Sequence, residues 1–139
     1  MIATDQEQVL ERQPLKAEID IVHIRQLVRL RGKEHGMGLI DQTRITTAAS
    51  EILRNMYVYA KGGEATISLV SVKGRRGLLV TCRDQGPGIP DIELAMQDGY
   101  STANSLGSGL PGAQRLVDRL DLESTVGQGT TVQLLKYIP

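Results

Sequence analysis

Glycine is unevenly distributed along this chain of 139 residues, and eight of its fifteen glycines fall between Gly86 and Gly129. Residues 84–91 hold two glycines and two prolines, and residues 98–109 are rich in glycine and serine. Neither segment suits a helix or a strand, because glycine leaves the backbone too free and proline lacks the N–H that both structures use. Regular structure is therefore expected on either side of these two loops.

Hydrophobic periodicity predicts the helices and most of the strands. Apolar residues follow helical spacing from residue 21 to residue 35 and, more clearly, from Asp41 to Ala60. A third helical stripe runs from Leu110 to Leu120, and a short helix is expected at residues 91–97. Apolar and β-branched runs predict further strands at residues 65–72, 78–82, 120–125 and 130–138.

The N-terminal end is polar, and residues 1–12 are expected to be frayed. Alternating apolar positions predict a first strand at residues 14–21, with Asp20 capping the helix that follows. The whole order, β-α-α-β-β-(α)-α-β-β, mixes hairpins with helices. It favours an α+β fold with two layers over a doubly wound sheet, in one domain that spans residues 1–139.

Composition excludes several classes of function. Lys and Arg number 16, as do Asp and Glu, so a zero net charge argues against bulk attraction to nucleic acid or an anionic membrane. Trp and Phe are absent, which argues against stacking on single-stranded nucleic acid. Cys82 is a lone cysteine, and the first residues lack the apolar core of a secretion signal, so we expect a cytoplasmic protein.

Glu51 and Asn55 lie four residues apart on the strongest predicted helix, so they share one face. That face is about 100° from the apolar stripe of Ile52 and Met56, which places the pair at the border of the core. A carboxamide oxygen suits Mg²⁺, and a carboxylate can orient or deprotonate a hydroxyl group. The alternative is an ordinary solvated helix face.

Asp84 continues the alternation of the strand at residues 78–82, so its carboxylate is predicted on the core side of the strand end. A half-buried carboxylate needs a hydrogen-bond donor, and the exocyclic amine of a purine would supply one. Gly86 and Gly88 leave room beside it for a flat ring. The alternative is a capping aspartate in an ordinary turn.

Residues 107–112, GSGLPG, lead into the third predicted helix. Backbone N–H groups and the positive end of the helix dipole make such a start an anion site, and Pro111 suits the first turn. No G-K-[ST] follows, as a Walker loop requires, and no strand directly precedes the segment, as a Rossmann fingerprint requires. The alternative is a flexible linker.

Thr130 ends a second glycine motif, in which Gly127 and Gly129 flank one residue. It has the same parity as Val132 and Leu134 on the last predicted strand, so its hydroxyl is predicted to point inward. The alternative is a simple turn.

Together, in this order and on these elements, the segments resemble the N box and the three glycine boxes of the GHKL (Bergerat-fold) ATPase superfamily. Within that superfamily the chain is similar to the RsbT-type serine/threonine kinases, the switch kinases of bacterial stressosome modules. The resemblance covers residues 14–138. It rests on four stretches: residues 50–55 (SEILRN), 84–91 (DQGPGIPD), 98–102 (DGYST) and 106–112 (LGSGLPG).

The resemblance implies a mixed, mostly antiparallel sheet with helices on one face and ATP or ADP between the two layers. It implies that Glu51 is the catalytic residue, acting on the Ser or Thr hydroxyl of a protein substrate, and that Asn55 is a ligand of Mg²⁺. The other implied nucleotide contacts are Asp84 and Thr130 at the adenine, Gly86 and Gly88 lining its pocket, and Gly107, Gly109, Leu110 and Gly112 at the phosphates.

The resemblance also implies partners: STAS-domain proteins as substrates, and a protein phosphatase that the released kinase binds and activates. Neither nucleic acid nor a membrane is an expected partner. One alternative is a nucleotide-gated anti-sigma or partner-binding switch with little kinase activity. Another is a detached ATPase domain of the histidine-kinase or gyrase type, against which the chain shows no phosphoacceptor helix and no room for a transducer domain.

Overall fold

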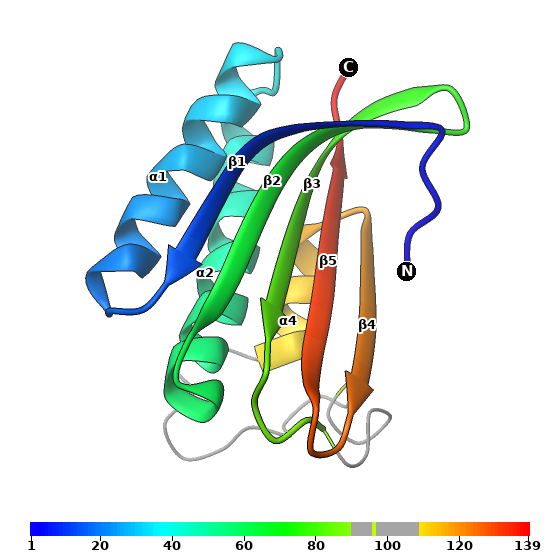
Figure 1. The fold of residues 1–139 in the computed structure, drawn as a ribbon. Helices are drawn as coiled ribbons and strands as arrows, with labels where there is room; N and C mark the ends of the chain where they lie inside the picture. Colours follow the sequence, from blue (N-terminus) through cyan, green and yellow to red (C-terminus); the bar gives the residue numbers. More distant parts are fainter. Residues whose placement is uncertain (90–95, 97–108) are drawn as a thin grey trace.

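The computed structural model describes residues 1–89, residue 96 and residues 109–139. The predicted succession of strands and helices is confirmed there. The short helix predicted at residues 91–97 and most of the loop at 98–109 lie outside the described residues. In chain order the elements are β1 (Gln6–Leu15), α1 (Ile19–Glu34), α2 (Leu39–Ala60), β2 (Gly63–Val72), β3 (Arg75–Asp84), α4 (Gly109–Leu116), β4 (Arg119–Thr125) and β5 (Gly129–Tyr137) (Figure 1).

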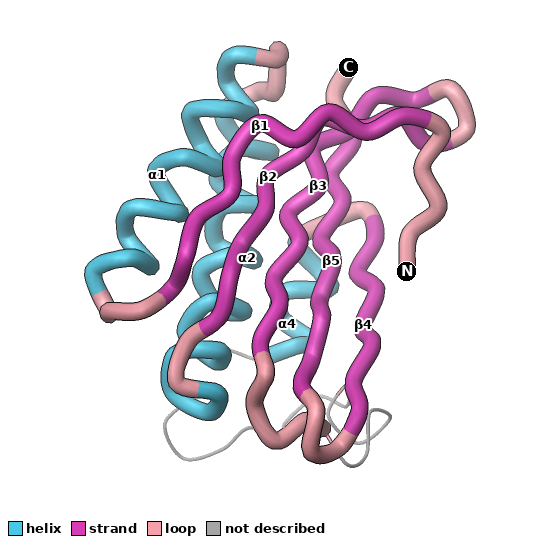
Figure 2. Tube along the Cα trace, viewed as in Figure 1, coloured by secondary structure: helices cyan, strands magenta, loops and turns pink. Residues whose placement is uncertain are grey.

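The five strands form one sheet in the order β1-β2-β3-β5-β4, and every neighbouring pair is antiparallel. All three described helices lie on the same face of this sheet, so the molecule has two layers (Figures 1 and 2). The predicted α+β fold is thereby confirmed, and no parallel pair occurs among the described strands. In the chain α4 follows β3 and leads into the hairpin β4–β5, which joins the sheet through β5.

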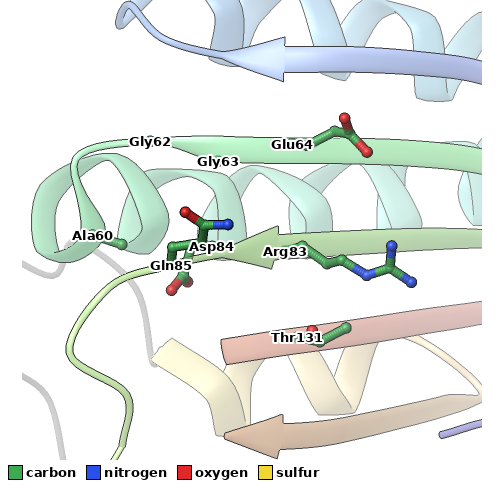
Figure 3. A pocket seen from close by; sticks show the side chains of 8 residues that line it. All are labelled: Ala60, Gly62, Gly63, Glu64, Arg83, Asp84, Gln85 and Thr131. Atoms are coloured by element: carbon green, nitrogen blue, oxygen red, sulfur yellow. The ribbon is translucent and has the colours of Figure 1, made fainter. Parts of the chain in front are cut away.

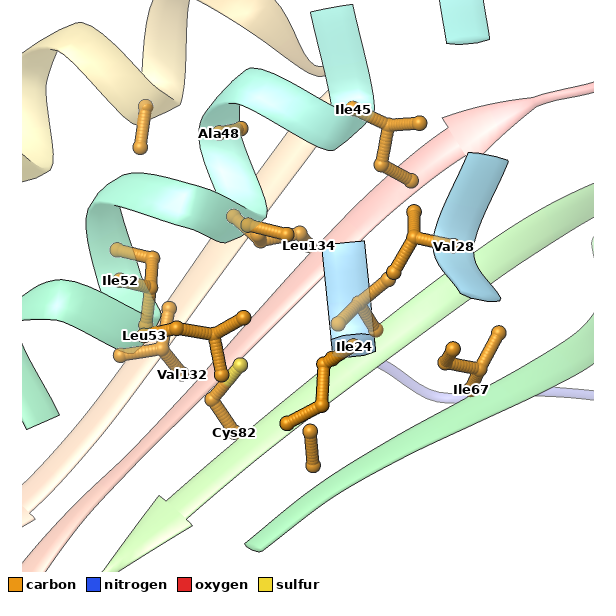
Figure 4. Close-up of a cluster of buried hydrophobic side chains, with 14 of the residues drawn as sticks. Ile24, Val28, Ile45, Ala48, Ile52, Leu53, Ile67, Cys82, Val132 and Leu134 are labelled. Atoms are coloured by element: carbon orange, nitrogen blue, oxygen red, sulfur yellow. The ribbon is translucent and has the colours of Figure 1, made fainter. Parts of the chain in front are cut away.

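The main core lies between the helices and the sheet, because residues that alternate along each strand turn one face toward the helices. Its apolar side chains come from α1, α2 and α4 on one side and from β1, β2, β3 and β5 on the other. Burial of this face fixes the helices on the sheet. Figure 4 labels part of the cluster: Ile24, Val28, Ile45, Ala48, Ile52, Leu53, Ile67, Cys82, Val132 and Leu134.

The prediction that residues 1–12 are frayed is wrong, because most of this segment forms β1 and pairs with β2. Strand pairing uses backbone groups, so a polar sequence can form an edge strand when its side chains find partners. Two pairs provide them: Glu11 forms a salt bridge with Arg31 of α1, and Glu7 accepts a hydrogen bond of 2.8 Å from the Ser68 hydroxyl of β2.

The position of the strand predicted at residues 14–21 is also wrong, since β1 ends at Leu15 and α1 already begins at Ile19. Glu18, rather than Asp20, is the N-cap residue of α1. The Asp20 carboxylate instead accepts hydrogen bonds from the N–H groups of Lys16 and Ala17, at 2.8 and 2.9 Å. These bonds, with that of Ala17 the larger cause, hold the pKa of Asp20 below its ordinary value.

The third helix is shorter than its apolar stripe predicted. It ends at Leu116, and Leu120 lies in β4. The change of direction is fixed at Asp118, whose N–H donates a hydrogen bond of 2.9 Å to the carbonyl oxygen of Leu135 in β5. The backbone thus leaves the helix and enters the sheet within three residues.

We expect Leu15→Ala to lower the free energy of unfolding by about 2 to 5 kcal/mol, because Leu15 is 1% exposed and its truncation leaves a cavity beneath β1. Val9→Ala on the same strand is the matched control, since Val9 is 40% exposed and its loss should cost less than about 1 kcal/mol. Urea denaturation followed by circular dichroism measures both. Equal, small effects would show that β1 is not docked as described.

Candidate functional site

Asp84 is the last residue of β3 and lies opposite Thr130, the second residue of β5, at one end of these two interior strands. One of its carboxylate oxygens, Oδ1, accepts hydrogen bonds from the backbone N–H groups of Gly86 and Thr130, at 2.9 and 3.2 Å. No described residue donates a hydrogen bond to the other oxygen, Oδ2. The side chain is half-buried. One oxygen therefore ties the loop after β3 to the start of β5, and the second is available to accept a hydrogen bond from a ligand.

Gly86 and Gly88 allow the chain after Asp84 to pass close to its neighbours. A Cβ on Gly86 would lie 2.5 Å from the Cβ of Ala60, the last residue of α2. Gly88 has a φ of +80°, and a Cβ there would lie 2.6 Å from the carbonyl oxygen of Thr125. Side chains at either position would thus push this loop away from the end of α2 or from the β4–β5 turn.

Ser124 is a site residue that the sequence analysis did not identify. Its hydroxyl lies 2.8 Å from the Thr130 hydroxyl and accepts a hydrogen bond of 2.8 Å from the N–H of Ile89. Ser124 joins Thr130 to the loop that follows Asp84. The predicted strands contained the signal, because a tight hairpin with Gly127 and Gly129 at its turn places residues 124 and 130 opposite each other.

Glu51 and Asn55 lie on α2 and are both half-buried. The Oε2 atom of Glu51 is buried and has no hydrogen-bond partner among the described residues. A buried carboxylate oxygen without a donor is costly, so this atom is suited to accept a hydrogen bond from a hydroxyl group that the described residues do not supply.

Helix α4 supplies Gly109, Leu110 and Gly112, whereas Gly107 lies outside the described residues. It packs on α2, and its residue Ala113 is fully buried. It begins at the end of the molecule where β3 ends (Figure 1). Its first turn therefore faces the same end of the fold as the loop after Asp84.

The predicted site residues thus form two groups. Asp84, Gly86 and Thr130 are joined by hydrogen bonds, and Gly88 belongs to the same loop. The second group lies on the helix pair: Glu51, Asn55, Gly109, Leu110 and Gly112. The contact of Gly86 with Ala60 connects the groups, because Ala60 ends the helix that carries Glu51 and Asn55.

A cleft of about 570 Å³ opens at the end of the sheet where β3 ends and β2 begins (Figure 3). Of the described residues predicted for the site, Asp84 alone lines it. Arg83 and Thr131, which also line it, alternate with Asp84 and Thr130 and so belong to the sheet face away from the helices. The cleft therefore borders the Asp84 cluster, and Ala60 at the end of α2 is the one described residue of the helix pair that lines it.

No three His, Cys, Asp or Glu side chains in the described ranges are grouped so that they could hold a metal ion. Mg²⁺ does not require such a group, since it usually takes one or two protein ligands and fills its octahedron with phosphate oxygens and water. The half-buried carboxamide of Asn55 beside an unpartnered carboxylate fits that pattern.

A sequence profile of the histidine kinase-, DNA gyrase B- and HSP90-like ATPases matches residues 40–138. The chain is also 50% identical, over 124 residues, to the serine/threonine-protein kinase RsbT of Bacillus subtilis (strain 168), which covers 89% of this chain and 93% of that protein. The chain belongs to the RsbT-type serine/threonine kinases of this ATPase family. Membership implies that this kinase binds ATP.

More distant relatives are anti-sigma factors. The kinase is 36% identical over 100 residues to the anti-sigma F factor of Thermoanaerobacter sp. (strain X514), which covers 68% of each chain. The fold is also similar to that in the crystal structure of the RsbU and RsbW domains of Rv1364c from Mycobacterium tuberculosis, with a TM-score of 0.65 at 18% identity. That match covers 96% of the kinase but 33% of the longer chain. The structural match shows a shared fold.

In the part of the kinase that the structure describes, no helix combines the length and the apolar character needed to cross a bilayer.

We expect Cys82 to resist thiol reagents in the folded kinase. The side chain is 1% exposed, and burial, with the nearby charge of Asp84 as a smaller cause, raises the pKa of its thiol to about 12. At pH 8 only about one thiol in ten thousand would then be ionised. Ellman's reagent should react slowly with native kinase and fast in 8 M urea, the internal control. Fast labelling of the native kinase would show that the strand end near Asp84 opens readily.

Proposed function

We propose that this kinase transfers the γ-phosphoryl group of ATP to a Ser or Thr of STAS-domain proteins in a bacterial stress-response module. Phosphorylation of these partners releases the kinase, which then binds and activates a protein phosphatase, all within the cytoplasm. The strongest support comes from the two carboxylate oxygens of Asp84: Oδ1 ties the loop after β3 to the start of β5, and Oδ2 is available to a ligand. A rigid, half-buried acceptor of this kind suits the amino group of adenine.

The adenine end of the proposed site consists of the Asp84 cluster. The free Oδ2 accepts a hydrogen bond from the exocyclic amine, and Thr130 supports a water molecule beside it. Gly86 and Gly88 let the loop after Asp84 pack closely on Ala60 and Thr125, which holds that loop beside the carboxylate. The hydrogen bonds of Oδ1 keep the carboxylate in place before the nucleotide arrives, which lowers the entropic cost of binding.

The phosphate end consists of the helix pair. Backbone N–H groups of Gly107, Gly109, Leu110 and Gly112 hold the phosphates at the start of α4, where the helix dipole favours anions. Asn55 would hold Mg²⁺, which neutralises phosphate charge when bound. The role of the protein here is mainly to position the γ-phosphoryl group in line with the attacking oxygen.

Glu51 acts on the acceptor hydroxyl. Its buried, unpartnered Oε2 accepts the proton of the Ser or Thr hydroxyl as the hydroxyl oxygen forms a bond with the γ-phosphorus. The bond between the γ-phosphorus and the bridging oxygen breaks at the same time, and its electron pair leaves with ADP. The lack of a donor to Oε2 among the described residues favours this role, since that oxygen is available to the incoming hydroxyl group.

A nucleotide-gated partner switch with little kinase activity is the second candidate. It is favoured by the relatives named as anti-sigma F factors, to which the chain is 36% identical over 100 residues. Stoichiometric capture of a STAS-domain protein without any phosphorylated product would support this candidate over the kinase proposal.

We predict that Asp84→Asn weakens ADP binding by about tenfold to a hundredfold in isothermal titration calorimetry. The amide keeps an oxygen for the N–H groups of Gly86 and Thr130 but presents a donor, rather than a charged acceptor, to the adenine amine. The control is Asp121→Asn, because Asp121 lies on β4 and pairs with Arg119 on the other sheet face. Equal ADP affinity in Asp84→Asn and in the unmodified kinase would contradict the adenine assignment.

We predict that Glu51→Gln lowers phosphoryl transfer by at least about a hundredfold and leaves ADP binding within about twofold, because glutamine cannot accept the hydroxyl proton. The assay transfers radiolabelled γ-phosphate from Mg·ATP to a STAS-domain protein encoded in the same genome. Glu123→Gln, an exposed change on β4, is the control and should remain active. Unchanged transfer by Glu51→Gln would exclude the proposed role of Glu51.

A further inference from the structure

Lys136 is a cation in a buried position. It lies on β5, on the face toward the helices, and is 8% exposed. Its Nζ lies 3.6 Å from Oδ1 of Asp41, in the first turn of α2, and 3.5 Å from Oδ1 of Asp118, in the link from α4 to β4. A buried ammonium group needs partners of this kind. Lys136 therefore bridges α2, β5 and the end of α4.

Asp118 fastens the C-terminal end of α4 to the sheet. Its Oδ2 accepts a hydrogen bond of 2.7 Å from the N–H of Tyr137, and its own N–H donates to the carbonyl oxygen of Leu135 at 2.9 Å. Asp118 therefore contacts three consecutive residues of β5, namely Leu135, Lys136 and Tyr137. Helix α4 has eight residues and is about 12 Å long, so fixing one end goes far toward setting the direction of the whole helix.

The same cluster fixes the start of α2 through Asp41. Along α2, Asn55 lies fourteen residues later, about 21 Å away. The cluster thus sits far from the proposed nucleotide contacts, yet it holds both helices that carry the phosphate end of that site. At the other end of the site, the Asp84 cluster is built from β3, β5 and their loops, and does not involve α4.

We propose that Lys136 is a positioning residue that, through Asp41 and Asp118, sets the placement of α4 against α2 and thereby the affinity for the phosphates of the nucleotide. This inference rests on the proposed function. It has a selective consequence: loss of the bridge loosens the phosphate end of the site and spares the adenine end. Without Lys136, two carboxylates would face each other across the helix pair, and their repulsion would separate the two helix ends.

The experiment compares the dissociation constants of ADP, which carries phosphates, and adenosine, which does not. Calorimetry with Mg²⁺ measures ADP, and saturation-transfer NMR measures the weaker adenosine. The variants are Lys136→Met, which keeps the apolar stem, and Asp118→Asn and Asp41→Asn, which keep the shape of each partner. Arg44→Met is the matched control, because Arg44 is a second cation beside Asp41, at 3.7 Å, but does not reach Asp118.

We expect Lys136→Met to weaken ADP binding by about 2-fold to 30-fold relative to adenosine, the range seen for couplings carried through packed elements. Asp118→Asn and Asp41→Asn should shift the ratio in the same direction, and Arg44→Met should leave it unchanged. If Lys136→Met does not fold, Asp41→Asn decides, since it removes one contact and leaves Lys136 paired with Asp118.

An unchanged ratio of the two constants in the folded variants would overturn the inference. An equal loss of ADP and adenosine affinity would also overturn it, because that is the signature of general destabilisation. Failure of the proposed function looks different: the unmodified kinase would then bind neither ligand.

Discussion

One face of the antiparallel sheet is buried under α1, α2 and α4, and the rest of the structure depends on that burial. The alternation of the strands sends every second side chain into the apolar layer, and this layer ends where the strands end. Side chains that keep the inward parity but lie past the core, such as Asp84 and Thr130, are then half-buried at its edge. A polar group in that position can be held by the backbone and still reach a ligand.

The two groups of site residues differ in how they are held. Backbone hydrogen bonds across β3 and β5 fix the Asp84 cluster, so its geometry follows from the sheet itself. The helix pair depends on side chains: α4 packs on α2, and Lys136 ties the start of α2 and the end of α4 to β5. A nucleotide bound across both groups would join a part of the fold fixed by main-chain bonds to a part fixed by packing and charge.

The spacing of apolar residues along the sequence predicted those features of the fold that depend on neighbouring residues. The period of 3.6 along α2 and the alternation of β3 placed the helix, the strand and the inward parity of Asp84 without a structure. The strand at residues 6–15 escaped prediction because its side chains are polar and its partners, Arg31 and Ser68, are far along the chain. Ser124 and Lys136 were missed for the same reason, since each matters only through tertiary contacts. Gly107 lies outside the described residues, and the roles assigned to all of the site residues stay predictions.

The proposed partner switch requires the kinase to distinguish ATP from ADP, two ligands with the same adenine. The Asp84 cluster cannot make that distinction, because it would contact only the base. The discrimination must arise at the phosphate end, where a change of one phosphoryl group alters the charge beside α4 and α2. Helix α4 is short, and the helix pair is tied together at its far end by one lysine and two carboxylates. A weak ionic bridge suits a site that must respond to the charge of its ligand. A helix pair held by apolar packing alone would respond less to that charge.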